Sequence, residues 1–182
     1  MQNTLTPERL FSEPALRVAQ PSQFKISPCG TYISFLQSSE AKTSVLDLWI
    51  FDRTTAQRFC LLMASAVANE EKENISALSP SERAERERRR QFTQGITEYF
   101  WLPQTTSVIA CIDGQAYQTD VQSSEPILLT SGDRRQAAFS VSPNGEFLGY
   151  VRDGDLYYRH IADPNKDELR VTVDATITLS NG

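Results

Sequence analysis

The stretch that decides the fold is FSVSPNGEFLGY, residues 139–150, in which a short apolar segment, a proline turn and a second apolar segment follow one another. The same order recurs in FKISPCGTYISF at residues 24–35 and, in a degenerate form, in YFWLPQTTSVIA at residues 99–110. Proline presets φ at the second position of a turn, and glycine closes the turn in two of the copies. The three stretches therefore predict an internal repeat built of β-hairpins.

The repeat continues beyond the second strand of each copy. Residues 112–117, IDGQAY, match residues 152–157, RDGDLY, and each Asp-Gly pair predicts a hairpin turn into a third strand. Asp47-Leu48-Trp49-Ile50 takes this place in the first copy after a longer connection. Fourth strands are then expected at residues 58–62, 126–130 and 169–172.

Four short strands per unit with a period of about 40 residues are typical of β-propeller blades. Pro143 follows Pro103 by 40 positions, whereas Pro103 follows Pro28 by 75, which leaves room for an insertion of roughly 35 residues. We therefore predict an all-β fold, a partial β-propeller of about three to three and a half four-stranded blades with a helical insertion in the first blade connection. Residues 1–182 would form the N-terminal part of a propeller domain, and residues 64–95 a helical arm between blades.

A β-sandwich of unrelated hairpins is the alternative fold. It does not explain why the copies keep one register across both the proline turn and the Asp-Gly turn. Closed propellers have four to eight blades, so these blades would form an incomplete ring. Residues 173–179 are expected to begin a further strand.

Composition narrows the classes of partner. The chain has 18 basic and 23 acidic residues and a net charge of −5, which argues against a nucleic-acid partner because phosphate binding usually needs a basic excess. No run of about 18 apolar residues occurs, so no membrane-spanning segment is expected. The N-terminus lacks the pattern of a signal peptide, which favours a cytoplasmic location, with a periplasmic one as the alternative if a leader has been removed.

The cysteines give no indication of a metal centre or a disulfide framework. Cys29, Cys60 and Cys111 are widely spaced, form no C-x-x-C pair, and are accompanied by a single histidine, His160. We expect three buried free thiols in strands and no cofactor. His160 is expected to be an ordinary surface or blade residue.

The insertion contains a charged segment that meets the rules for a helix. Ser79 is a suitable N-cap, Pro80 suits the first helical position, and Glu82 completes a capping box. Residues 83–90, RAERERRR, have high helix propensity and are arranged in Glu-to-Arg pairs four positions apart. A solvated, ion-paired helix is one interpretation of this pattern, and it is expected to end near Gly95.

An excess of arginine at the end of this helix favours a second, functional interpretation. Arg86 and Arg90 share one face, and Arg89 lies beside them in the run that begins at Arg88. The planar guanidinium is suited to gripping a carbonyl or carboxylate through two parallel hydrogen bonds. The segment is therefore a candidate binding element.

The chain resembles the dipeptidyl peptidase IV-type branch of the prolyl oligopeptidase family of serine peptidases. The residues that carry the resemblance are DLW at 47–49, ERERRR at 85–90 and GITEYFW at 95–101. Bacterial members and cytosolic animal dipeptidyl peptidases have an arginine-rich R-E-R-x-R helix followed by a G-I-x-x-Y strand. The resemblance extends over nearly the whole chain and is most specific from Arg86 to Tyr99.

The resemblance implies a concrete activity for the whole enzyme. Such enzymes join an eight-bladed N-terminal propeller to a C-terminal α/β-hydrolase domain, commonly form homodimers, and release dipeptides after Pro or Ala from peptides with a free N-terminus. Their helix reaches the active-site cavity, where an arginine approaches the substrate backbone. By spacing to Gly95 and Ile96 the matching residue is Arg90, with Arg86 second and Arg89 reached by a one-residue slip.

The chain also departs from the family pattern. The Glu-Glu pair that anchors the substrate amino group is not found after Glu71, and no G-x-S-x-G occurs. With one histidine and no such serine, a Ser-Asp-His triad cannot be assembled, so the hydrolase domain is missing from these residues and the chain itself should not cleave peptides. A non-enzymatic propeller that binds a protein or peptide, or a scaffold whose arginines dock on an acidic partner or membrane surface, are the competing functions.

Overall fold

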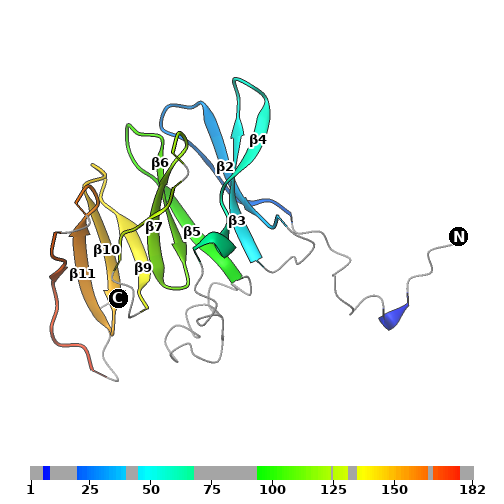
Figure 1. The fold of residues 1–182 in the computed structure, drawn as a ribbon. Helices are drawn as coiled ribbons and strands as arrows, with labels where there is room; N and C mark the ends of the chain where they lie inside the picture. The colour runs from blue at the N-terminus through cyan, green and yellow to red at the C-terminus, as the bar shows by residue number, and fades with distance from the viewer. Residues whose placement is uncertain are drawn as a thin grey trace, which may run out of the picture.

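The computed structural model describes residues 6–8, 20–39, 45–67, 94–123, 125–130, 135–163 and 166–176. These residues form three four-stranded antiparallel units that lie side by side, from right to left in Figure 1. Blade 1 consists of β1 (Ser22–Ile26), β2 (Tyr32–Gln37), β3 (Val45–Asp52) and β4 (Gln57–Leu62). Blade 2 consists of β5 (Gln94–Trp101), β6 (Ser107–Ile112), β7 (Gln115–Asp120) and β8 (Ile127–Leu128). Blade 3 consists of β9 (Ala137–Val141), β10 (Phe147–Arg152), β11 (Asp155–His160) and β12 (Leu169–Arg170).

Within each blade the strands pair in sequence order, each antiparallel to the next. The predicted all-β, partial propeller with four strands to a blade is confirmed for the described residues. A short parallel pairing of Val45 with Gln94 and of Leu46 with Gly95 joins β3 to β5. This pairing makes one continuous sheet of blades 1 and 2, whereas blade 3 is a separate sheet.

The proline turns of blades 1 and 3 have the same hydrogen bonds. The Gly30 amide donates to the Ser27 carbonyl at 2.8 Å, and the Tyr32 amide donates to Ser27 Oγ at 3.0 Å. The Gly145 amide likewise donates to the Ser142 carbonyl at 2.8 Å, and the Phe147 amide donates to Ser142 Oγ at 2.9 Å. The Ser-Pro-x-Gly repeat is thus a local structure that the hydroxyl and the glycine stabilise together.

Blade 2 has neither the serine nor the glycine of this turn, and neighbouring residues take over their roles. Leu102 stands where the serine is expected, and the residue with positive φ is Gln104 instead of a glycine at the next position. Thr105 supplies the missing hydroxyl, because Thr105 Oγ1 donates to the Leu102 carbonyl and accepts from the Ser107 amide, both at 3.2 Å. The degenerate copy therefore forms the same type of hairpin with different donors.

The first strand of each blade (β1, β5 and β9) is interrupted by a β-bulge. Gln23 in β1 and Ala138 in β9 have positive φ, and the register of each strand shifts at that point. In β5 the register shifts between Ile96 and Glu98. A bulge bends a strand and increases its twist. Because a bulge recurs close to five residues before each proline, it is a regular feature of the blades.

One hydrophobic core lies between blades 1 and 2 and another between blades 2 and 3. Corresponding positions of the repeat face corresponding sides of each blade. Val108 and Ala110, five and seven positions after Pro103, pack toward blade 1 with Leu36. Ile109 and Cys111, six and eight positions after the same proline, pack toward blade 3. We call the face directed to the preceding blade the back face and the face directed to the following blade the front face.

The cysteine prediction was wrong at one position. Cys111 is buried in β6 and Cys60 is half-buried in β4, but Cys29 is exposed. Cys29 lies between Pro28 and the glycine of the turn, where a side chain points to solvent instead of into a sheet. All three are free thiols.

Candidate functional site

The predicted substrate-binding residues Arg86, Arg89 and Arg90 lie outside the residues that the structure describes. Of the predicted arm at residues 64–95, only its two ends are described. Ala64–Ala66 form the 3-10 helix η1, and Gln94 and Gly95 open β5. The structure thus describes the two places, both at the junction of blades 1 and 2, where the predicted arm would begin and end.

Asp47 fixes the outgoing end of the base. Its carboxylate accepts hydrogen bonds from the Ala64 amide at 2.8 Å and from the Ser39 amide at 3.1 Å, and the Ser39 hydroxyl donates to it as well. Asp47 is buried at the start of β3. One carboxylate therefore holds both the residues that follow β2 and the first residue of η1.

Gly95 fixes the returning end of the base. Its φ is +81°, and a Cβ at this position would lie 2.6 Å from the Leu46 carbonyl oxygen and 2.9 Å from the Leu46 nitrogen. Only glycine allows β5 to approach the backbone of β3 this closely at a positive φ. The glycine of the G-I-x-x-Y stretch is thereby explained by the parallel pairing of Leu46 with Gly95.

The two other fixed residues of that stretch are core residues. Ile96 and Tyr99 are fully buried between blades 1 and 2. The Tyr99 hydroxyl accepts a hydrogen bond from Ser34 Oγ at 3.0 Å and donates to the Gln23 carbonyl. Burial of the phenol raises the pKa of Tyr99 to about 12, so the neutral donor persists at physiological pH.

Tyr117 closes the base from the side of blade 2. Its hydroxyl donates to the carbonyl of Val67, the last described residue at the first end of the predicted arm, at 3.2 Å. Burial, with a smaller contribution from the nearby Asp113 carboxylate, raises the pKa of Tyr117 above its usual value, which keeps the hydroxyl protonated. Asp47, Gly95 and Tyr117 together form the arm base, in which both described ends of the insertion are held by buried or half-buried groups.

Lys25 connects the first strands of blades 1 and 2, β1 and β5, at the same junction. Lys25 Nζ donates to the Tyr99 carbonyl and lies 4.5 Å from the centroid of the Tyr99 ring and 4.9 Å from that of Phe100. Desolvation lowers the pKa of Lys25, while the Glu98 carboxylate acts in the opposite direction. The ammonium ties β1 to β5 through a carbonyl and two ring faces.

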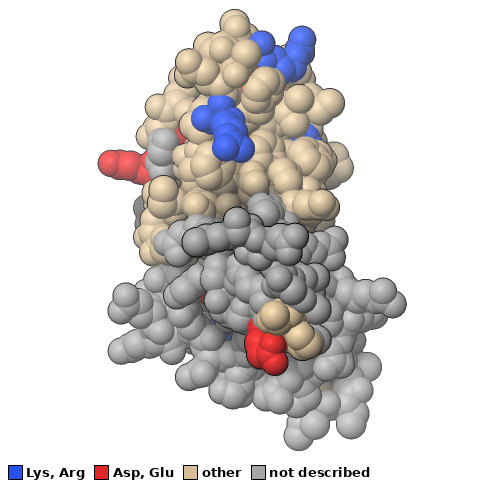
Figure 2. All heavy atoms as spheres, turned by 90° about the vertical axis from the view of Figure 1, so that its right-hand side faces the viewer, with Lys and Arg blue, Asp and Glu red and all other residues tan. Residues whose placement is uncertain are grey.

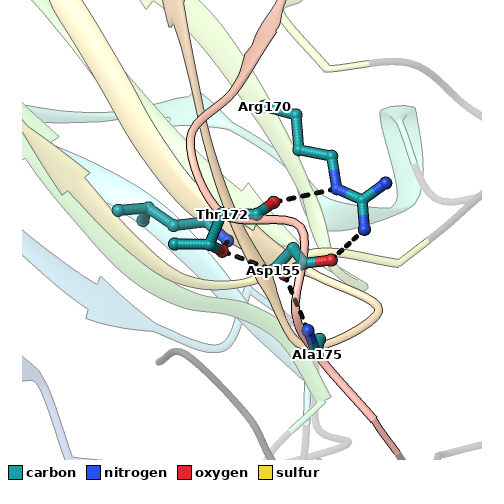
Figure 3. Close-up of polar contacts among 5 residues, drawn as sticks. Asp155, Arg170, Thr172 and Ala175 are labelled. Atoms are coloured by element: carbon teal, nitrogen blue, oxygen red, sulfur yellow. Dashed lines mark hydrogen bonds and ion pairs between the residues drawn. The ribbon is translucent and has the colours of Figure 1, made fainter.

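The contacts of Asp47 recur in blade 3, where Figure 3 shows them around Asp155. Asp155 Oδ1 accepts from Thr172 Oγ1 at 2.9 Å and from the Ala175 amide at 3.2 Å, and Oδ2 forms an ion pair with Arg170. Thr172 Oγ1 also accepts from the Leu156 amide at 2.9 Å. An acidic residue at the start of the third strand therefore holds the chain that leaves the fourth strand.

Blade 2 uses Gln115 in place of the aspartate. Gln115 Oε1 accepts from Thr130 Oγ1, which in turn accepts from the Ala116 amide at 3.1 Å. Sequence reasoning missed this recurring group, although Asp-Leu-aromatic occurs twice in the sequence and indicated it. Its structural role in blades 2 and 3 shows that Asp47 belongs to the blade framework as well as to the arm base.

A hollow lies between the proline turns of blades 1 and 2. Its lining residues are Pro28, Cys29, Gln104, Thr105, Thr106, Ser107 and Asp120. Asp120 accepts from Thr106 Oγ1 at 2.9 Å, from Ser107 Oγ at 2.7 Å and from the Gln122 amide at 2.8 Å. Partial burial opposes ionisation, but these hydrogen bonds outweigh it and hold the pKa of Asp120 below its usual value.

Cys29 forms one wall of this hollow. The Ser27 hydroxyl lies 3.3 Å from Cys29 Sγ. Hydrogen bonds to the sulfur, from Ser27 first and then from Thr31, lower the pKa of Cys29 to about 7. An exposed thiol that is half thiolate near neutral pH is a nucleophile, whereas burial and the Asp47 charge raise the pKa of Cys60 to about 11.

The described residues contain no group of three or more His, Cys, Asp or Glu side chains placed to hold a metal ion.

His160 ends β11, with its ring centroid 4.4 Å from that of Phe147, and so packs on an aromatic neighbour. Within the described part of the chain there is no helix with the length and hydrophobicity needed to cross a bilayer.

Comparison with known proteins agrees with the resemblance. Residues 104–182 match the model of the family described as "Dipeptidyl peptidase IV (DPP IV) N-terminal region". The predicted resemblance to this N-terminal region is confirmed. The DPP IV match covers blades 2 and 3 from the proline turn of blade 2 onward. It begins after the arginine-rich segment and includes only Tyr117 of the arm base.

A solved structure described as "Crystal structure of the tricorn protease" has a similar fold. Its TM-score is 0.50 and its sequence identity is 12%, over 87% of this chain. At this identity the likeness concerns the fold alone. The present chain spans 14% of the length of that tricorn chain.

Proposed function

We propose that this chain is the N-terminal part of the propeller of a dipeptidyl peptidase of the DPP IV type, and that this propeller admits and orients peptide substrates. The substrates would be peptides with a free N-terminus and Pro or Ala at the second position. A hydrolase domain outside these residues would supply the serine, aspartate and histidine. The family match at residues 104–182 is the observation that carries the proposal.

The arm base supports a binding role for the arginine-rich segment. The described residues on either side of 68–93 lie at one junction, where Asp47, Gly95 and Tyr117 fix the chain through two hydrogen bonds and one close backbone contact. A binding group is effective when its support is rigid, because orientation then costs little entropy on binding. In this proposal Arg90 donates to a backbone carbonyl of the bound peptide, with Arg86 and Arg89 as the neighbouring positions.

The test is kinetic and uses a longer protein in which these residues are joined to the hydrolase domain. Arg90→Ala would remove one or two charge-assisted hydrogen bonds worth about 1.5–3 kcal/mol each. The expected loss in kcat/KM on an Ala-Pro anilide is about tenfold to a few hundredfold. Arg90→Lys should restore only part of it, because lysine keeps the charge but loses the planar fork.

Arg83→Ala, near the start of the same segment, is the matched control and should leave kcat/KM unchanged. If Arg86, Arg89 and Arg90 can each be replaced by alanine without kinetic cost, the proposed role of the segment is wrong. If the longer protein carries no hydrolase domain, the chain belongs instead to a propeller that binds peptides or proteins without cleaving them.

A further inference from the structure

The carboxylate of Asp47 is divided between two segments of blade 1. Ser39, which follows β2, donates to Asp47 Oδ2 through its amide at 3.1 Å and through its hydroxyl. The amide of Ala64, the first residue of η1, donates to Asp47 Oδ1 at 2.8 Å. Because both oxygens belong to one carboxylate, the contact with Ser39 also fixes the direction in which Oδ1 faces the Ala64 amide.

A longer connection between the second and third strands distinguishes blade 1 from the other blades. It runs from residue 38 to residue 44, whereas the Asp-Gly pairs at 113–114 and 153–154 join these strands in blades 2 and 3. Ser39 belongs to this connection, so its hydroxyl has no counterpart in the two-residue hairpins. Blade 1 therefore departs from the repeat beside the point where the predicted arm begins, and such departures are expected where a repeat serves a function beyond its framework.

Asp47 depends on these donors because it is buried, with 6% of its surface exposed. Figure 2 views blade 1 from the side and shows lysine and arginine side chains toward the top, at the end that carries the β3–β4 hairpin. Asp47 lies near the start of β3, at the opposite end of that strand. Among the described residues its carboxylate is held by two amides and one hydroxyl, so loss of the Ser39 hydroxyl would leave a buried charge with fewer donors.

We propose that Ser39 is a positioning residue for the arginine-rich segment and that it acts through Asp47. By holding Oδ2, Ser39 keeps Oδ1 on the Ala64 amide and so sets the direction in which the chain leaves blade 1. The inference rests on the proposed function, in which Arg90 donates to a carbonyl of the bound peptide. A fixed starting point for the segment reduces the entropy that is lost on binding, so the role of Ser39 is in substrate affinity and not in the chemical step.

The first measurement is kinetic and uses the longer protein with its hydrolase domain. Ser39→Ala should raise KM for an Ala-Pro anilide about threefold to tenfold, because one hydrogen bond to a charged group is lost, and should leave kcat nearly unchanged. Ser39→Thr keeps the hydroxyl, and the exposed position of Ser39 leaves room for the added methyl group. This variant should therefore restore the KM of the wild type.

The second measurement is amide hydrogen exchange at Ala64, followed by mass spectrometry on the same proteins. Ser39→Ala should increase the exchange rate of this amide about tenfold, and Ser39→Thr should not. Thr106→Val is the matched control, because Thr106 Oγ1 donates to the Asp120 carboxylate, which likewise accepts a backbone amide, at the opposite end of the blade from the arm base. It removes the same kind of hydrogen bond and should change neither KM nor the exchange of Ala64.

The two measurements separate failure of this inference from failure of the proposed function. If Ser39→Ala leaves KM unchanged while Arg90→Ala lowers kcat/KM, Ser39 has no positioning role and the proposed function stands. If KM rises without faster exchange at Ala64, Ser39 does not act through Asp47 and the inference is wrong. If Arg90→Ala is itself without kinetic effect, the proposed role of the segment is wrong and the role of Ser39 is wrong with it.

Discussion

Replacing Gly95 with alanine should destabilise the fold far more than a glycine substitution at an ordinary turn. The φ of +81° would cost an alanine about 1–2 kcal/mol. The new Cβ would lie 2.6 Å from the Leu46 carbonyl oxygen, so β3 and β5 must move apart. Overpacking of this kind costs about 1–3 kcal/mol, and the lower entropy of the unfolded alanine chain returns about 0.4–1 kcal/mol. The expected net loss in free energy of unfolding is about 2–4 kcal/mol.

Gly30→Ala separates the two contributions in the same protein. Gly30 has a φ of +70°, but the nearest atom to its added Cβ is Arg53 Nη1 at 3.9 Å. This variant therefore has the conformational cost without the collision and should lose only about 1 kcal/mol. Urea unfolding followed by tryptophan fluorescence measures both. Equal losses for the two variants would refute the close approach of β5 to β3 as the reason for glycine at position 95.

Three other predictions concern the thiols, the acid stability and the activity. Iodoacetamide should alkylate Cys29 about a hundredfold faster than Cys60 at neutral pH, with a half-maximal rate near pH 7, and equal rates would contradict the pKa of about 7 assigned to Cys29. Burial opposes ionisation of Glu168, but the Arg152 guanidinium and the Tyr150 hydroxyl hold its pKa below the usual 4.5. Its stabilisation is therefore fully present above about pH 4.5 and lost as the pH falls through the lowered pKa. Glu168→Gln should accordingly flatten the dependence of the unfolding free energy on pH below about pH 4.5. The isolated chain should release no chromophore from an Ala-Pro anilide, and turnover that co-purifies with it would disprove the absence of a catalytic triad.

The parts of the fold that the sequence predicts are those decided by neighbouring residues. Ser27 and Ser142 act on the turns that follow them directly, and Asp113 and Asp153 take the positive φ that their Asp-Gly pairs indicate. Such contacts recur wherever the same residues recur, so the order of the strands could be predicted from the sequence alone. The exposure of Cys29 could have been predicted in the same way, because the residue stands between a proline and a glycine at a turn.

The arm base could not be predicted in this way, since its contacts join residues far apart in the chain. Asp47 binds the Ala64 amide 17 positions away, and Tyr117 reaches Val67 across 50 positions. Neither pair has a period or a motif that identifies the partner. The Asp47 contact forms within blade 1, and only the packing of blade 2 on blade 1 brings Tyr117 to Val67.

The stretch G-I-x-x-Y has a structural role at the blade junction, unlike the binding role that we propose for the arginines before it. Gly95, Ile96 and Tyr99 are each accounted for by the junction of blades 1 and 2, through a close backbone contact, a buried side chain and a buried hydroxyl. None of the three is left available to contact a peptide. In the proposed function, recognition of substrate comes from the segment between η1 and β5, and the junction fixes the chain on both sides of that segment. A substitution at Gly95 would consequently reduce stability and binding together, whereas one at Arg90 would reduce binding alone, so the two losses can be told apart in one protein.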